Sequence, residues 1–597
     1  KRMCGIFALL NYYDDMNMDA GEVHNSFMKG ISRGPEMTTD LIPLPNRVTF
    51  GFHRLAINGL SNSSSQPIAY DNIYIICNGE IYNYKELYSY LDIEPVTKSD
   101  CEVIIHVYMK YGIEYTLQIL DGVFSFVLLD MRKPFEPIIF VARDPYGVRP
   151  LFILHDNRKS HRKSSNLIGF ASELKMLCDI NDCPRRYLHQ HRPGTYSSFL
   201  HQNEQWFCDS ECIRYTTLPF STNMTTVCMS GIFETIRTKL CQAVYKRVHT
   251  TERPIACLLS GGLDSSLIAA LVNRYSMMYS GKPIETYSIG LAGSPDIEYA
   301  SKVATYIGSI HREIIVSEQS FFDAIPEVIK VLESYDTTTV RASVGNYLVC
   351  KYIQENSEAK VVFNGDGADE LMGGYLYFYH ARDAIDFDKE CRRLMANIHY
   401  YDVLRSDRTI SSNGLEPRTP FLDRDWVQYY MSIHMDIRYH PGMQQQEKYL
   451  VRKAFDCDFE FIDYTTKKSD HRPLLPREVL YRTKEAFSDG VSVKLRSWYE
   501  IIQEKVGELL TENSSSGISR YDLPKYHFSE HGRTRLTQEQ AYYKYLFDLD
   551  YSGCGSVIPS YWMPRFVDAK DASARSLNIY TSITSIHNVE GKDEEDE

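Results

Sequence analysis

"LLSGGLDSS" (258–266) joins a short apolar strand to a helix through two glycines, Gly261 and Gly262. Because glycine has no Cβ, the backbone N–H groups of such a turn can point inward and approach an anion closely. The start of the following helix adds partial positive charge at the same place. No G-x-x-x-x-G-K-[ST] motif occurs in the chain, so this is not a Walker loop. The segment predicts a phosphate-binding loop of another kind.

The polar side chains of this segment fit the same interpretation. Ser260, Ser265 and Ser266 offer hydroxyls to phosphate oxygens. Asp264 would repel a bare phosphate, so its expected task is to hold Mg²⁺ against one. The alternative is a plain strand–helix turn, because S-G-G alone is common.

Strand and helix patterns alternate on both sides of the loop, which is typical of a parallel α/β sheet. The predicted helices cover 231–248, 264–278 and 298–308, and the predicted strands cover 254–259, 284–291 and 360–367. From about 318 to 500 the chain is mostly helical in pattern.

The part of the chain before residue 209 is rich in strand patterns instead. Predicted strands cover 73–79, 122–130 and 138–144. Residues 99–112 predict a helix with one apolar face, capped by Ser99 or Asp100. The pattern weakens from 209 to 230, so we expect a domain boundary there.

A chain of 597 residues is too long for a single core. We expect one domain at 4–208, a second at 230–560, and a disordered acidic tail at 588–597. The polar, basic stretch 155–166 predicts a solvated hairpin loop.

Composition limits the partners and the compartment. A net charge of −13 argues against nucleic acid, and no stretch approaches the roughly 20 apolar residues of a membrane helix. No apolar signal region follows the N-terminus, and the 14 cysteines form no C-x-x-C pair. We therefore expect reduced thiols and a cytoplasmic protein with no membrane partner.

Six histidines and cysteines fall close together in the chain, but their spacing fits no standard zinc pattern. We expect them to be ordinary loop and strand residues: Cys178, Cys183, His189, His191, Cys208 and Cys212.

Further motifs follow the loop in order: "SIGLAGSPDIEYA", "SYDTTTVRASVGNYL", "GDGADELMGGYLYF", "EPRTPFLD" and "KEAFSDGVS". "SGGLDSS" itself matches the pyrophosphate-loop ATP pyrophosphatases. Together the motifs closely resemble glutamine-hydrolysing asparagine synthetases over nearly the whole chain. The resemblance implies an α+β N-terminal-nucleophile hydrolase with layered antiparallel sheets and helices. An α/β parallel-sheet synthetase domain with a helical C-terminal part would follow it.

The resemblance assigns the first domain to the class II glutamine amidotransferases. Cys4 would then be the nucleophile, and its own α-amine the base, because such an amine titrates near working pH. That requires Cys4 to be the first residue, so we expect Lys1 to Met3 to be absent from the mature enzyme. The other matching positions are Asn78 and Gly79 for the oxyanion, Arg54 for the glutamine carboxylate, and Glu80 and Asp100 for its ammonium group.

In the second domain the resemblance implies that aspartate attacks ATP to give β-aspartyl-AMP and pyrophosphate. Ammonia, led from the glutamine site through an internal channel, would then release asparagine and AMP. The expected ATP contacts are Leu258, Ser260, Gly261, Gly262, Asp264, Ser265, Ile289, Asn364 and Gly365. Asp264 and Asp369 match the Mg²⁺ ligands, Lys484 matches the catalytic cation, and Thr338, Thr339 and Arg341 match the aspartate side. The resemblance also allows a homodimer.

The chain departs from the family motif S-G-E-G-S-D-E, reading "NGDGADE" at 364–370. Asn364 replaces a serine, and the catalytic position Asp366 replaces a glutamate, which puts the rate of synthesis in question. Three alternatives stay open: an ammonia-dependent synthetase, a related amidating ATP pyrophosphatase such as a β-lactam synthetase, and a catalytically silent scaffold.

Overall fold

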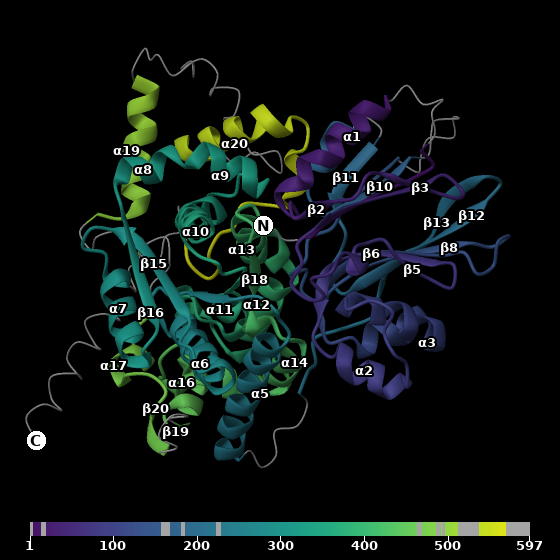
Figure 1. Cartoon of the computed structure of the whole chain (residues 1–597). Helices are drawn as coiled ribbons and strands as arrows, with labels where there is room; N and C mark the ends of the chain where they lie inside the picture. Colours follow the sequence, from purple (N-terminus) through teal and green to yellow (C-terminus); the bar gives the residue numbers. More distant parts are fainter. Residues whose placement is uncertain are drawn as a thin grey trace, which may run out of the picture.

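The computed structural model describes residues 4–12, 19–156, 167–180, 186–221, 228–462, 469–484, 491, 496–511 and 536–568. Figure 1 shows a β-rich N-terminal half beside a larger half built around a parallel sheet. Most of the predicted 155–166 loop and the whole predicted tail at 588–597 lie outside the described residues.

Two antiparallel sheets face each other in the N-terminal half. Their inner faces are apolar, and Ile6, Phe50 and Val127 are fully buried between them. The first sheet contains β1 (Gly5–Leu10), β2 (Met37–Thr38), β3 (Ile42–Leu44), β4 (Val48–Arg54), β9 (Phe152–Asp156), β10 (Ile168–Ala171) and β11 (Arg186–Gln190). The second contains β5 (Ile68–Tyr70), β6 (Ile73–Ile81), β7 (Gly122–Asp130), β8 (Ile138–Arg143), β12 (Thr195–Gln202) and β13 (Gln205–Arg214).

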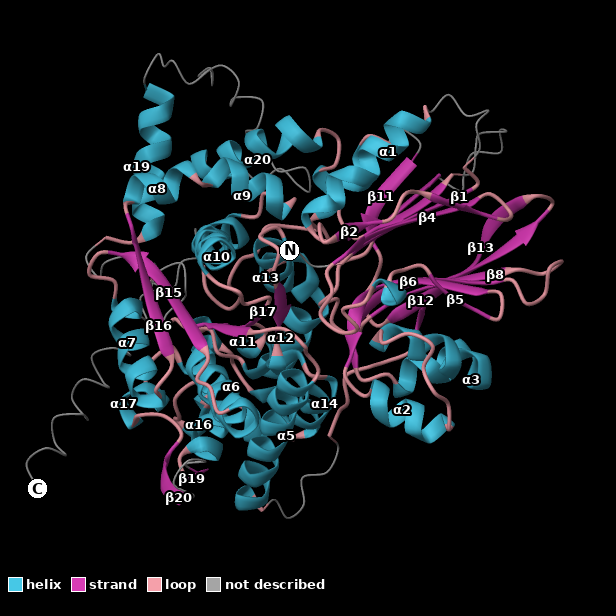
Figure 2. Ribbon diagram, viewed as in Figure 1, coloured by secondary structure: helices cyan, strands magenta, loops and turns pink. Residues whose placement is uncertain are grey.

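Helices cover the outer faces of both sheets (Figure 2). The first sheet carries α1 (Ala20–Met28) and α4 (Lys175–Cys178), and the second carries α2 (Tyr84–Leu91) and α3 (Val103–Ile119). The side chain of Ser99 accepts from the Cys101 N–H and caps the short turn that leads into α3, as predicted. Gly112 has φ +75° and interrupts α3, because only glycine adopts that conformation easily.

A five-stranded sheet forms the centre of the second half, in the order β16–β15–β14–β17–β18. All its neighbouring strands are parallel. The strands are β14 (Ile255–Leu258), β15 (Glu285–Leu291), β16 (Ile310–Val316), β17 (Val361–Phe363) and β18 (Glu416–Arg418). The phosphate-type loop therefore leaves the middle strand at the carboxyl edge, where ligands of α/β sheets bind.

Helices pack around this sheet and form most of the C-terminal part. They are α5 (Met229–His249), α6 (Leu263–Ser280), α7 (Pro295–Ile307), α8 (Glu318–Asp323), α9 (Ile325–Leu332), α10 (Thr337–Asn356), α11 (Ala368–Met372), α12 (Ala384–Asn397), α13 (Asp402–Ser411), α14 (Arg424–Ser432), α15 (Met435–Arg438), α16 (Tyr449–Phe455), α17 (Arg477–Leu480), α19 (Trp498–Thr511) and α20 (Gln538–Tyr551). A hairpin, β19 (Asp458–Ile462) and β20 (Ser469–Pro473), projects from them. The predicted fold class is confirmed in both halves.

Buried ion pairs join the two halves along α13. Arg33 of the N-terminal half bonds both carboxylate oxygens of Asp407, at 2.7 and 3.0 Å. Arg408, next on the helix, lies 2.8 Å from Glu333 and 3.5 Å from Glu173. All five side chains are at most 2% exposed. Among the described residues, no helix is long and apolar enough to span a membrane.

Candidate active sites in the two halves

Cys4 lies directly before β1, with its Sγ 3.4 Å from both the N and the O of Leu55. Its carbonyl oxygen accepts from Nε of the buried Arg33 at 2.9 Å. Burial raises the pKa of the Cys4 thiol to about 12, although the Leu55 backbone contact opposes this. The thiol therefore needs a base before it can act as a nucleophile near neutral pH.

Asn78 and Gly79 lie on β6, close to the strand that follows Cys4. The Ser172 hydroxyl links β6 to β1. It accepts from the Ile6 N–H of β1 at 3.0 Å and lies 3.5 Å from Asn78 Nδ2 of β6. Asn78 Oδ1 is buried and has no hydrogen-bond partner among the described residues. A Cβ at Gly79 would lie 2.4 Å from the Val123 carbonyl oxygen, so only glycine fits there.

The predicted glutamine-binding residues complete this cluster. Arg54 donates to the carbonyl of Ser61 at 2.8 Å, and Glu80 accepts from the Asn58 side chain at 2.6 Å. Burial raises the pKa of Asp100 to about 6, even though it accepts from the Ile81 N–H. Burial also raises the pKa of Glu80 well above its usual value. An ammonium group beside these carboxyl groups would stabilise their ionised forms.

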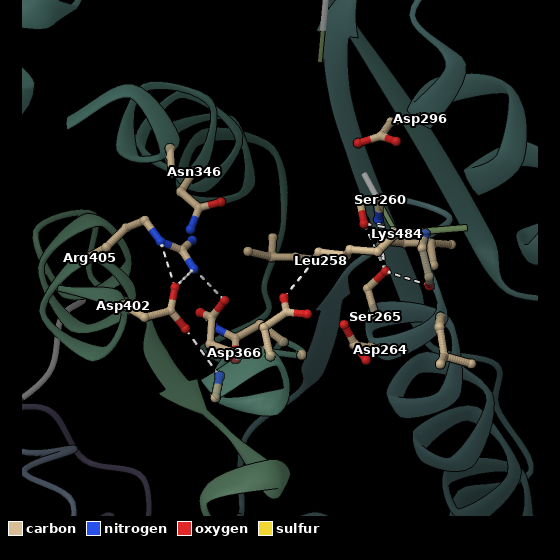
Figure 3. A pocket seen from close by; sticks show the side chains of 18 of the residues that line it. Leu258, Ser260, Asp264, Ser265, Asp296, Asn346, Asp366, Asp402, Arg405 and Lys484 are labelled. Carbon is tan, nitrogen blue, oxygen red and sulfur yellow. Dashed lines mark hydrogen bonds and ion pairs between the residues drawn. The ribbon is translucent and has the colours of Figure 1, made fainter. Parts of the chain in front are cut away.

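In the second half, the glycine-rich loop borders a cavity of about 200 Å³ (Figure 3). Ser260 and Ser265 bond to each other at 3.0 Å, while Gly261 has φ +70° and packs against Tyr299. Gly365, after β17, comes so close to the loop that a Cβ would lie 2.9 Å from Ser265 N. Of the nine predicted ATP contacts, all but Gly261 line the cavity: Leu258, Ser260, Gly262, Asp264, Ser265, Ile289, Asn364 and Gly365.

Two carboxylates and two lysines meet inside this cavity. Lys448 Nζ lies 2.5 Å from both Asp264 Oδ2 and Asp369 Oδ1, and Lys484 Nζ lies 2.6 Å from Asp369 Oδ2. Although burial opposes it, the two ammonium groups hold the pKa of Asp369 well below its usual range. Asp264 Oδ1 is buried and has no hydrogen-bond partner among the described residues. This free carboxylate oxygen, close to a second carboxylate, fits the all-oxygen coordination that Mg²⁺ prefers.

Asp366 lies at the other side of the cavity, where two side chains bond its carboxylate (Figure 3). Asn364 Nδ2 donates to it at 2.6 Å and also bonds the Ser406 hydroxyl at 2.7 Å. Arg405 forms an ion pair with it at 2.6 Å. Burial raises the pKa of Asp366 to about 6 despite the opposing effect of Arg405. Asn364 and Asp366, two of the positions that depart from the family motif, are therefore in direct contact.

The predicted aspartate-side residues divide into two groups. Thr338 and Thr339 line the cavity at the start of α10, and the Thr338 hydroxyl has no partner among the described residues. Arg341 does not line the cavity. Its guanidinium bonds both oxygens of Glu539, at 2.8 and 2.6 Å. Arg341 as an aspartate contact stays a prediction, and in this structure its charge is paired with Glu539.

Several cavity residues were not predicted from the sequence. Besides Lys448 and Arg405, they include Asp402, whose carboxylate accepts from the Gly367 N–H at 3.1 Å. Lys448 has φ +61°, which is uncommon for a residue with a side chain. No local pattern marks these residues, because each reaches the site only through tertiary packing.

The histidines and cysteines weighed as a zinc group are dispersed. Cys178 contacts Cys554, with the two Sγ atoms 3.6 Å apart. Ligand atoms of His189, His155 and Glu211 lie within 4.8 Å of one another, a grouping that the spacing did not suggest. Cys183 lies outside the described residues.

Comparison with known proteins agrees with this arrangement. The asparagine synthase family matches residues 235–386 and 381–549, and the glutamine amidotransferase domain matches 3–205. Asparagine synthetase [glutamine-hydrolyzing] of Gallus gallus is 37% identical, and the alignment covers 97% of this chain and 99% of that protein. The proteins of that name from Mus musculus and Homo sapiens are 37% and 36% identical, with the same coverage of both chains. The chain therefore belongs to the family of glutamine-hydrolysing asparagine synthetases.

Proposed function

We propose that the chain converts aspartate, glutamine, ATP and water into asparagine, glutamate, AMP and pyrophosphate. One observation carries this proposal beyond family membership. The loop, the Asp264–Asp369 pair and two lysines share one cavity with Asp366. Cys4 lies in a separate polar cluster of the other half. Two sites of different chemistry on one chain suit a reaction in which ammonia released from glutamine at one site is used at the other.

In the glutamine site, the α-amine of a mature Cys4 would take the thiol proton, and the thiolate would attack the side-chain amide carbon. The Asn78 amide and the Gly79 N–H are the proposed donors to the resulting oxyanion. The amine then returns its proton to the leaving nitrogen, which departs as ammonia. Water hydrolyses the thioester and frees glutamate.

In the synthetase site, the aspartate side-chain carboxylate would attack the α-phosphorus of ATP, and pyrophosphate would leave. Lys448 and Lys484 are positioned to stabilise the charge on the phosphate oxygens. Asp264 and Asp369 would hold Mg²⁺, which supplies further charge neutralisation when bound. Asp366 stands at the position of the family's glutamate and is the proposed group on which formation of β-aspartyl-AMP depends; burial raises its pKa to about 6, so it is mostly ionised at neutral pH.

The direct test follows the transferred nitrogen. Aspartate, ATP and glutamine labelled with heavy nitrogen in its side-chain amide should give labelled asparagine, with equal amounts of AMP and pyrophosphate. Mass spectrometry of asparagine and chromatography of nucleotides measure both. Release of ADP, or formation of asparagine only when ammonium salts are added, would contradict the proposal.

We expect the KM for glutamine to rise as the pH falls below about 6, because the Asp100 carboxyl has that pKa and must be ionised to pair with an ammonium group. Initial rates of glutamate release at several pH values give KM and kcat separately. Asp100→Asn should raise KM at pH 7 and weaken its dependence on pH. A KM that stays constant in wild-type protein while pH falls through this range would exclude Asp100 from the binding site.

Asp366→Glu is expected to slow pyrophosphate release by about 10- to 100-fold, since a shift of about 1 Å at a reacting centre has costs of this order. The longer side chain would collide with the Asn364 amide that now bonds Asp366. Asn364→Ser added to it should restore part of the rate. The four proteins form a double-mutant cycle, in which strictly additive effects would show that the two positions do not compensate each other.

A further inference from the structure

Cys178 and Cys554 place two thiols in contact across the junction of the two halves. Their Sγ atoms lie 3.6 Å apart, although 376 residues separate them in the chain. Cys178 ends α4 in the N-terminal half, and Cys554 precedes a short turn, Gly555–Val557, beyond α20. A disulfide has an S–S distance of about 2.05 Å, so the two sulfur atoms need to approach by about 1.5 Å to form one.

One short segment after α9 fixes the backbone on both sides of this contact. Glu333 accepts from the Leu174 and Lys175 N–H groups, at 2.8 and 3.0 Å, at the start of α4. Two residues later, the Tyr335 hydroxyl donates to the carbonyl of Gly555 at 2.7 Å. The segment that contains Glu333 and Tyr335 therefore holds the backbone next to each of the two cysteines.

The two thiols also differ in their exposure and in the direction of their pKa shifts. Cys178 is partly exposed, whereas Cys554 is buried. The contact with Cys178 lowers the pKa of the Cys554 thiol, and the same contact together with burial raises the pKa of Cys178. An accessible sulfur thus lies beside a second sulfur that loses its proton more easily.

We propose that Cys178 and Cys554 form an oxidisable dithiol that a peroxide converts into a disulfide tether between the N-terminal half and the C-terminal segment. The thiol that loses its proton first is oxidised by the peroxide to a sulfenic acid, and the peroxide is reduced to water. The other thiol then attacks the sulfenic sulfur, the S–O bond breaks, and the leaving hydroxide takes that thiol's proton to give a second water. Two thiols and one hydrogen peroxide thereby become one disulfide and two waters, and a thiol reductant reverses the change.

The test treats the full-length reduced protein with hydrogen peroxide and maps the product. Digestion before aspartate residues separates Cys178, in the peptide 156–178, from Cys183, because Asp179 and Asp182 lie between them. The expected product is peptide 156–178 linked to peptide 550–567, which contains Cys554, and a thiol reductant should release it. A link from Cys554 to Cys183, or no link while Cys178 is recovered as a higher sulfur oxide, would overturn the proposal.

Single-cysteine variants test whether the linked peptide depends on Cys178 and Cys554 or on oxidation of any exposed cysteine. Cys178→Ser and Cys554→Ser should each abolish the linked peptide, while Cys228→Ser, at an exposed cysteine elsewhere, should leave it unchanged. The disulfide closes a very long loop, so oxidised wild-type protein should unfold at a temperature several degrees above the reduced form. The same treatment should not raise the transition of Cys178→Ser. An equal rise in that variant would show that the tether is not the cause.

Discussion

Protein that keeps residues 1–3 is expected to hydrolyse glutamine about 1,000-fold more slowly than protein that begins at Cys4, because general-base catalysis contributes on the order of 100- to 10,000-fold. Burial raises the pKa of the thiol to about 12, so almost none of it is thiolate at neutral pH. A free α-amine, with an ordinary pKa of about 8, would supply the missing base on the same residue. When residues 1–3 remain, that nitrogen is an amide and cannot accept the proton.

Two proteins test this prediction, one produced with residues 1–3 and one processed to start at Cys4, each verified by intact mass. Glutamate release measures the glutamine site, and asparagine formed from ammonium salts measures the other site. Only the first rate should differ between them. Cys4→Ala should abolish glutamine hydrolysis in both forms and leave ammonium-dependent synthesis intact. Equal glutamine hydrolysis by the two wild-type forms would rule out the α-amine as base.

Asp264→Asn should lower pyrophosphate release by about 100- to 1,000-fold, which is the usual loss when one charged or polar group that stabilises a transition state is removed. The change removes the negative charge of one of the two carboxylates that surround Lys448, and it replaces one of its oxygens with an amide NH2 group, which is a poor Mg²⁺ ligand. Lys448 would then pair with Asp369 alone. Two lysines would share a single carboxylate in this part of the cavity.

Pyrophosphate release and glutamate release are measured on the same Asp264→Asn protein, and glutamate release should stay near the wild-type rate. Asp425→Asn provides a matched control, because Asp425 also pairs with a lysine, Lys239, but at an exposed site outside the cavity. Manganese binding in the presence of ATP, followed by electron paramagnetic resonance, should weaken in the Asp264 variant alone. Pyrophosphate release at the wild-type rate would remove Asp264 from the metal site.

The sequence predicted the features of the fold that depend on short-range patterns. The strand predicted at 254–259 is present as β14 (Ile255–Leu258), and the helix predicted from 264 begins at Leu263. Both could be predicted because strand and helix periodicity and the two glycines are local properties. The Ser99 cap was predicted for the same reason.

Contacts between distant segments could not be predicted from such patterns. Arg341 pairs with Glu539, 198 residues away, so its side of α10 follows from tertiary packing and not from the local motif. Lys448 reaches Asp264 from 184 residues away and would have looked like any surface lysine. Cys178 was weighed as a zinc ligand with its neighbours in sequence, whereas its actual neighbour is Cys554. The roles of the site residues remain predictions.

The ion pairs along α13 limit how the chain can be divided. Expressing the second half alone would remove Arg33, which now neutralises Asp407, whereas Arg408 would keep its ion pair with Glu333. Removing one partner of a buried pair costs about 3–5 kcal/mol where the remaining charge stays buried. A stand-alone ammonia-using synthetase cut from this chain would therefore need an uncharged replacement at Asp407 before it could be handled as a separate protein.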